Sequence, residues 1–233
     1  MSGYEYVRKN YENLLKEISG YEELYKRSIT VVAVTKSGSD EELLSLVKAG
    51  ASDLAENRPG ELKRRADLLR EAGYAPRFHE IGNLQRNKVK LVVNEAALIH
   101  SVGKYELAEE ISQQATKLGI TVPVLIEINS ANEDAKGGVA PEDAEELFLK
   151  IRELPSLSVR GIMTMGPALD NAEDMRPYFR LTKEIFDRIN TKHGYDGEGI
   201  LSMGMSNSYA VAIEEGSTLI RVGRKLFEKN EGR

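Results

Sequence analysis

The sequence contains no cysteine among its 233 residues. Without cysteine there can be no disulfide framework, no thiolate metal site and no cysteine nucleophile. The three histidines lie far apart in the sequence and the carboxylates are scattered, so no metal-ligand spacing is present. We therefore expect no metal site.

Long apolar runs and an excess of positive charge are also missing. No run of 18 apolar residues occurs, so we expect no membrane-spanning helix. The N-terminus lacks the charged and then apolar pattern of a signal peptide, which makes the cytoplasm the expected location. The formal net charge is −5 with interspersed signs, whereas a nucleic-acid-binding protein usually has a basic face. Neither membranes nor nucleic acids are expected partners.

What the sequence does contain is a regular alternation of strand-like and helix-like segments. The predicted strands span 31–35, 53–55, 77–81, 97–102, 121–128, 158–164, 199–203 and 218–222. Eight strands joined by helical crossovers predict an α/β fold, a parallel (β/α)8 TIM barrel. No linker or composition break divides residues 1–233, so we expect a single domain. An extra N-terminal helix of about four turns is predicted to end near Gly20.

Polar residues follow the predicted strands at the ends where such barrels carry their active sites. Lys36 comes directly after the first strand, and two interpretations of it are open. Its side chain could bury its stem and leave its ammonium in solvent. Alternatively, a partly desolvated amine at this position could bind a carbonyl compound as a Schiff base.

The loops after the last two strands favour the second interpretation. Residues 202–206 run into a predicted helix start, and Gly223-Arg224 follow the eighth strand. Backbone amides in such loops bind phosphate, and these two loops are the usual phosphate site of the fold. A Schiff-base lysine opposite a phosphate site would take an aldehyde that carries a phosphate. Pyridoxal 5′-phosphate (PLP) has both groups.

Five segments carry a family resemblance: 32–36 (VAVTK), 78–88 (FHEIGNLQRNK), 161–165 (GIMTM), 201–206 (LSMGMS) and 216–223 (GSTLIRVG). Together and in this order they resemble the pyridoxal phosphate homeostasis protein family, and the resemblance spans nearly the whole chain. It implies a barrel like the N-terminal domain of alanine racemase, which is the type III fold of PLP proteins. It also implies that Lys36 holds PLP as a Schiff base.

The same resemblance assigns the remaining contacts. Ser206, Gly223 and the backbone amide of Arg224 fall on the phosphate contacts, Arg221 on the arginine that faces the pyridine nitrogen, and Asn57 on a residue that lines the cofactor. The family often has threonine where this chain has Arg224. Two roles are therefore open for Arg224: its side chain could pair with the phosphate, or only its amide could bind.

The histidines and methionines are interpreted as structural. His79 and His100 are expected to be hydrogen-bonded residues of the barrel, and neither they nor any other residue is assigned a catalytic role. Four methionines are expected to pack around the cofactor ring: Met163, Met165, Met203 and Met205.

Two function classes follow from the resemblance. The first is a non-catalytic PLP-binding protein that buffers the cofactor or delivers it to PLP-dependent apo-enzymes, and that acts as a monomer. The second is a PLP-dependent amino-acid racemase. Racemases of this fold use a tyrosine from an added β-domain, and the chain ends at Arg233, soon after the eighth strand, so we favour the first class. A class I aldolase, which needs no cofactor, is a third and weaker alternative.

Overall fold

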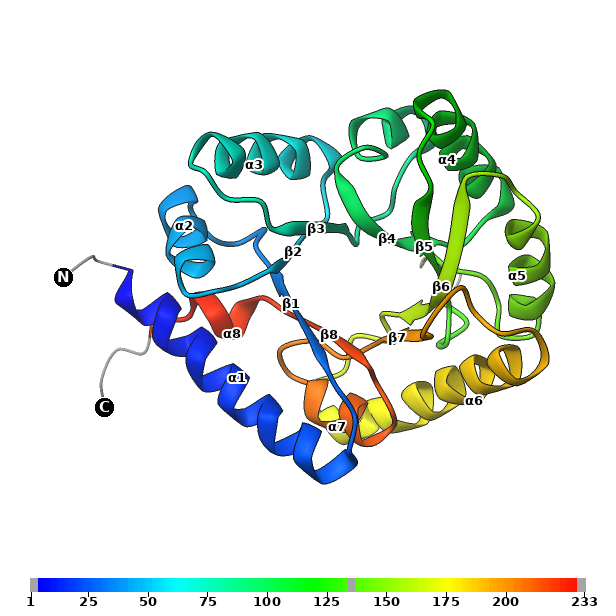
Figure 1. Cartoon of the computed structure of the whole chain (residues 1–233). Helices are drawn as coiled ribbons and strands as arrows, with labels where there is room; N and C mark the ends of the chain where they lie inside the picture. Colours follow the sequence, from blue (N-terminus) through cyan, green and yellow to red (C-terminus); the bar gives the residue numbers. More distant parts are fainter. Residues whose placement is uncertain (1–3, 134–136, 230–233) are drawn as a thin grey trace.

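The computed structural model describes residues 4–133 and 137–229. Within these ranges eight parallel strands close into a barrel in chain order, from β1 to β8. Figure 1 shows the helices in a ring outside the strands. The strands are Thr30–Val34 (β1), Asp53–Glu56 (β2), Arg77–Glu80 (β3), Ala96–Val102 (β4), Val122–Ile128 (β5), Leu157–Thr164 (β6), Ile200–Ser202 (β7) and Leu219–Val222 (β8). The predicted (β/α)8 barrel is confirmed.

The helices are α1 (Glu5–Tyr25), α2 (Asp40–Lys48), α3 (Pro59–Glu71), α4 (Tyr105–Leu118), α5 (Ala144–Arg152), α6 (Arg176–His193), α7 (Tyr209–Glu214) and α8 (Arg224–Phe227), with 3₁₀ segments η1 (Arg86–Leu91) and η2 (Ala172–Met175). Helices α2 to α7 and the two 3₁₀ segments lie in the predicted crossovers, whereas α1 precedes β1 and α8, which was not predicted, follows β8. The polar loop between β5 and α5 includes residues 134–136, which lie outside the described residues.

The N-terminal helix is longer than predicted, and the expected end near Gly20 is wrong. α1 continues to Tyr25 and ends where Lys26 adopts a left-handed backbone with φ 51°. A glycine inside a helix costs about 1 kcal/mol relative to alanine. Beyond Gly20, however, Tyr21 and Tyr25 pack against the hydrophobic core, and this packing extends the helix. α1 lies beside α2 and α8 on the outside of the barrel (Figure 1).

The β1–α2 connection, which carries Lys36, ends in a well-capped helix. Ser39 accepts a hydrogen bond from the Glu42 amide, and the Glu42 side chain accepts one from the Ser39 amide. This capping box satisfies two amides that would otherwise lack helical partners. Gly38 approaches α8 so closely that a Cβ there would lie 2.6 Å from the Phe227 ring. The turn between β1 and α2 is therefore held by the α2 cap and by its contact with α8.

The loop after β7 also differs from the prediction. Residues 202–206 do not run straight into a helix, because α7 begins only at Tyr209. Ser208 forms a turn first: its amide donates to the Met205 carbonyl at 2.9 Å, and its hydroxyl accepts from the Met205 amide at 3.2 Å. Sequence alone does not reveal this local side-chain turn, which delays the helix.

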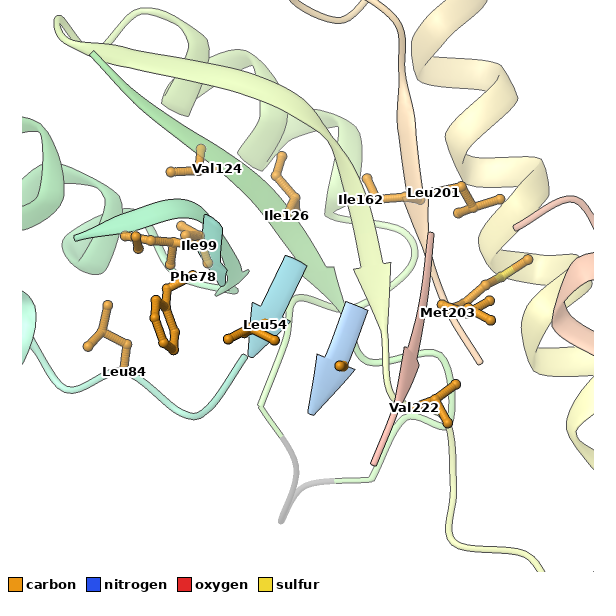
Figure 2. Packing of buried hydrophobic residues seen from close by; sticks show 14 of the residues in the cluster. Leu54, Phe78, Leu84, Ile99, Val124, Ile126, Ile162, Leu201, Met203 and Val222 are labelled. Atoms are coloured by element: carbon orange, nitrogen blue, oxygen red, sulfur yellow. The ribbon is translucent and has the colours of Figure 1, made fainter. Parts of the chain in front are cut away.

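Two apolar layers hold the barrel together. The interior is filled by Val32, Val34, Ala55, Leu98, Leu125, Met163 and Leu219. The larger layer lies between the strands and the helices, and Figure 2 shows part of it, including Leu54, Ile126 and Ile162. Successive strand residues point alternately inward and outward, so each strand contributes to both layers.

Candidate functional site

A cavity of about 500 Å³ is lined by residues at the ends of β1, β3, β6, β7 and β8 and in the loops that follow them. These are carboxyl ends of strands, where barrels of this kind carry their functional sites. Five of the six residues predicted to bind the cofactor line this cavity: Lys36, Ser206, Arg221, Gly223 and Arg224. They come from the two ends of the chain, which meet because β1 pairs with β8.

Asn57 is the sixth predicted residue, and it is not among the residues that line the cavity. It follows β2, and its backbone packs tightly against the β3 loop. A Cβ at Gly82 would lie 2.1 Å from the Asn57 carbonyl oxygen, so only glycine fits at position 82. The predicted contact between Asn57 and the cofactor stays a prediction.

A buried arginine holds the turn that carries Lys36. Arg65 of α3 donates to the Thr35 carbonyl at 2.5 Å and to the Gly38 carbonyl at 2.6 Å, on either side of Lys36. It also pairs with the buried carboxylate of Glu56 at 2.7 Å. Burial raises the pKa of Glu56, although hydrogen bonds from Thr35 and Arg65 oppose the rise. The backbone around Lys36 is thus anchored from outside the barrel, while its side chain is exposed at the cavity.

A second buried carboxylate lies beside Glu56. Glu80 is paired in register with Glu56 on the neighbouring strand and is fully buried. Its Oε1 accepts from the Gly82 amide at 2.8 Å, whereas Oε2 has no hydrogen-bond partner among the described residues. Burial, assisted by the charge of Glu56, raises the pKa of Glu80 to about 7.

Arg221 forms the floor of the cavity and is only 2% exposed. Its guanidinium donates to the Ser202 hydroxyl at 2.6 Å, to the Thr164 carbonyl at 2.9 Å and to the Met165 sulfur at 3.4 Å. Burial lowers the pKa of Arg221 to about 10, and the Glu127 carboxylate opposes that change. Arg221 therefore remains charged at neutral pH. Glu127 lines a smaller cavity of about 280 Å³ beside the first.

The two loops predicted to bind phosphate lie against each other. The Gly223 amide donates to the Ser206 hydroxyl at 3.2 Å. Gly204 has φ +92°, and a Cβ there would lie 2.6 Å from the Ala212 side chain, so a side chain would force the β7 loop away from α7. Arg224 also lines the cavity. The loops thus bring hydroxyl, amide and guanidinium donors to one side of it.

One wall of the cavity was not predicted as part of the site. Apolar residues after β6 and at the end of the chain form it: Pro167, Ala168, Leu169, Ala172, Met175 and Phe227. The apolar run after Gly166 could have indicated this wall. Of the four methionines expected near the cofactor, Met165 and Met205 line the cavity. Met163 lies in the barrel interior and Met203 in the outer layer, and for these two the contact with the cofactor stays a prediction.

A chain of polar side chains crosses the barrel interior below the cavity. Asp53 contacts His79 Nε2 at 3.0 Å, and His79 Nδ1 contacts His100 Nε2 at 2.9 Å. His100 Nδ1 contacts the Ser202 hydroxyl at 3.0 Å, and Ser202 accepts from Arg221. The interpretation of both histidines as hydrogen-bonded barrel residues is confirmed.

Residues 4–133 and 137–229, which the structure describes, contain neither a metal-binding cluster nor a membrane-spanning helix. Histidine, aspartate and glutamate side chains there do not gather in groups of three or more that could hold a metal ion. In the same ranges, each helix is too short or too polar to span a membrane.

Comparison with known proteins places this architecture in context. The family model described as "Alanine racemase, N-terminal domain" matches residues 9–230. A protein of Aquifex aeolicus named "Pyridoxal phosphate homeostasis protein" is 40% identical over 197 residues, which cover 84% of this chain and 85% of the relative.

Solved structures share this fold over nearly the whole chain. A protein from Bifidobacterium adolescentis, described only as "an unknown protein", is 33% identical, with a TM-score of 0.88 over 96% of this chain and 95% of that chain. PipY of Synechococcus elongatus, solved without PLP, is 25% identical, with a TM-score of 0.86 over 95% of this chain and 100% of that chain. PipY has also been solved with PLP bound; that structure is 24% identical to this chain and has a TM-score of 0.83.

Proposed function

Because this chain belongs to the pyridoxal phosphate homeostasis protein family, within the alanine racemase N-terminal domain family, we propose that it binds PLP and buffers or delivers it inside the cell. One observation carries the proposal. Lys36, Arg221 and the paired loop residues Ser206 and Gly223 line a single cavity. The name of the Aquifex aeolicus relative, "Pyridoxal phosphate homeostasis protein", agrees with this proposal.

The residues present fit the cofactor. A cavity of about 500 Å³ lies within the usual range for small-molecule sites. Lys36, Arg221 and Arg224 make its lining positive, and Glu228 is the single acidic residue among the described lining residues. This balance suits a phosphate group, which carries up to two negative charges. The apolar wall with Met165 and Met205 offers packing for an aromatic ring.

Each residue then has a defined task. Lys36 supplies the primary amine that holds the aldehyde as a Schiff base. Ser206, Gly223 and Arg224 supply donors for the phosphate. Arg65 keeps the Lys36 backbone in place before any ligand arrives, because its bonds to the Thr35 and Gly38 carbonyls do not involve the cavity.

Arg221 would affect whether the ring nitrogen of the bound cofactor is protonated. PLP supplies an aldehyde and a ring that withdraws electrons most strongly when its nitrogen is protonated. Arg221, charged at neutral pH, would donate to that nitrogen and disfavour a proton there. A weaker electron sink suits storage better than reactions through a carbanion.

The lining also supports binding over racemisation. Neither tyrosine nor histidine occurs among the described residues that line the cavity. The nearby Tyr209 points away, since its hydroxyl donates to Glu17 of α1 at 2.7 Å. A racemase needs a second acid or base opposite the lysine, and Glu228 is the single acidic candidate among the described lining residues. We further propose PLP-dependent apo-enzymes as acceptors, and a monomer acting in the cytoplasm.

The test is to titrate the purified protein with PLP and to reduce the complex with borohydride. We expect a yellow complex and a PLP-sized mass increase on Lys36 after proteolysis. Lys36→Ala should abolish both. Lys104→Ala is the matched control, because Lys104 also follows a strand but is exposed outside the cavity. A wild-type protein that stays colourless with excess PLP would refute the proposal, and amino-acid racemisation abolished by Lys36→Ala would replace it with the enzyme alternative.

A further inference from the structure

The polar chain below the cavity links five strands. Asp53 lies on β2, His79 on β3, His100 on β4, Ser202 on β7 and Arg221 on β8. Each of these residues is at most 5% exposed. The four contacts that join them measure 3.0, 2.9, 3.0 and 2.6 Å. Such a continuous series in a barrel interior is costly unless every donor meets an acceptor.

The two ends of the chain determine the position of every hydrogen in it. Arg221 can only donate, so the Ser202 oxygen accepts from it. The single hydroxyl hydrogen of Ser202 must then go to His100 Nδ1, which leaves the His100 hydrogen on Nε2. That hydrogen goes to His79 Nδ1, and the hydrogen on His79 Nε2 goes to the Asp53 carboxylate.

The opposite direction leaves groups unsatisfied. If His100 carried its hydrogen on Nδ1, Ser202 would receive two donors and its own buried hydroxyl hydrogen would lose its acceptor. His79 would then have to be a charged imidazolium to reach both His100 and Asp53. The one-way series needs no charge on either histidine. Burial lowers the pKa of His100 well below its usual range, and the charge of Arg221 acts in the same direction, which supports a neutral ring.

The far end of the series is firmly held. Asp53 also accepts from Ser52 at 2.7 Å and from Arg77 at 2.6 Å. Burial alone would raise the pKa of Asp53, but the hydrogen bonds from His79, Arg77 and Ser52 outweigh it and lower the pKa well below its usual range. Asp53 is therefore a fixed anion at the opposite end of the series from the fixed cation, Arg221.

We propose that His79, His100 and Ser202 form a one-way hydrogen-bond series, anchored on Asp53, that positions the Arg221 guanidinium against the ligand in the cavity. The series binds the guanidinium at Nη1, through Ser202, and the Thr164 carbonyl binds it at Nη2. The orientation of its remaining donors toward the cavity is then set before the ligand binds. Ser202, His100 and His79 are positioning residues, and the ligand part of the proposal depends on the proposed binding of PLP.

The first experiment tests the series without any ligand. Long-range ¹H–¹⁵N spectra of the ¹⁵N-labelled protein at pH 7 report which ring nitrogen of each histidine carries hydrogen. We expect His79 and His100 to be neutral, with hydrogen on Nε2 and an unprotonated Nδ1 in both. His193, outside the barrel beside Glu145, provides the reference signal. A charged His79, or hydrogen on Nδ1 of His100, would overturn the proposal.

The second experiment compares two buried serines. Ser202→Ala removes the link to Arg221, and we expect PLP to bind roughly tenfold more weakly, with an altered absorption band. Ser217→Ala is the control: Ser217 is equally buried but bonds only to backbone carbonyls of residues 201, 203 and 219. It should lower stability while PLP affinity and spectrum stay unchanged. Equal effects of the two substitutions on the spectrum, or none from Ser202→Ala, would overturn the proposal.

A third pair keeps the test decisive if Ser202→Ala does not fold. His100→Leu should reproduce the weaker binding, and His100→Asn should restore part of it, because its amide oxygen can accept the Ser202 hydrogen. Indistinguishable PLP affinity in these two variants would count against the series. If the wild-type protein does not bind PLP, the proposed function fails, whereas the histidine spectra still decide the direction of the series.

Discussion

Glu80→Gln should make the protein more stable above neutral pH. The Glu80 carboxylate is fully buried, and its Oε2 lacks a partner among the described residues. Its pKa is about 7 in the folded chain and 4.5 when unperturbed. Between these values the unfolded state loses a proton that the folded state keeps. The free energy of unfolding therefore falls as the pH rises from 4.5 to about 7, and Glu80 causes no further fall above that pH.

The magnitude follows from the two pKa values. Their difference, at 1.36 kcal/mol per pH unit, gives roughly 3 kcal/mol at pH 8 and about 1 kcal/mol at pH 5. Glutamine avoids this loss, because it cannot ionise and its amide oxygen can still accept from Gly82. A gain of this size is large beside a total stability of about 5–15 kcal/mol.

The assay is urea unfolding of both proteins at pH 5, 6, 7 and 8. The stability difference between variant and wild type should grow with pH and level off above pH 7. Glu71→Gln serves as the control, since Glu71 is exposed at the end of α3 and should give a small difference that does not change with pH. A Glu80→Gln difference that is the same at pH 5 and pH 8 would refute the reasoning.

Three further substitutions test other parts of the structure. Arg65→Met should lower the free energy of unfolding in urea by about 3–5 kcal/mol, because it leaves the buried Glu56 carboxylate without its cation. The control is Arg70→Met, at an exposed arginine of the same helix, which should lower it by less than about 1 kcal/mol. Arg224→Ala should weaken PLP binding roughly tenfold by fluorescence titration if its side chain pairs with the phosphate, and unchanged affinity would leave the contact to its amide alone. Ser39→Ala should lower the unfolding free energy by about 1 kcal/mol through loss of the α2 cap, and a change below a few tenths would contradict the capping box.

The barrel could be predicted from sequence because its signals are local. Short apolar runs alternate with capped helices along the sequence, and the capping residues Ser39 and Glu42 indicate the start of α2. The wrong predictions concern helix ends whose positions depend on contacts that the local sequence pattern does not show. Tertiary contacts of Tyr21 and Tyr25 carry α1 past Gly20, and a side-chain turn at Ser208 delays α7.

The site shows the same division. The place of Lys36 and Gly223 at strand ends could be read from the sequence, since all eight strands end on one face. The Asp53 to Arg221 series could not, because it depends on inward alternation and register in five strands at once. His100 and Ser202 touch across the barrel, although β4 and β7 are not neighbours in the sheet. The anchoring of Lys36 by Arg65 likewise needs the packing of α3 on β2 and β3, which brings Arg65 to the Thr35 and Gly38 carbonyls.

The pairing of β1 with β8 has a consequence for how the protein folds. This seam joins the first and last strands, as in the alignment of Val32 with Arg221, and among the strand pairs of the barrel it has the longest intervening chain. Contacts of such high sequence separation have a large loop-closure entropy and form slowly. Because Lys36 and Gly223 lie on opposite sides of the seam, a ligand that bridges them binds only the closed barrel. At a hundredfold excess over its dissociation constant it would add about 2.7 kcal/mol to stability and slow the reopening of that seam.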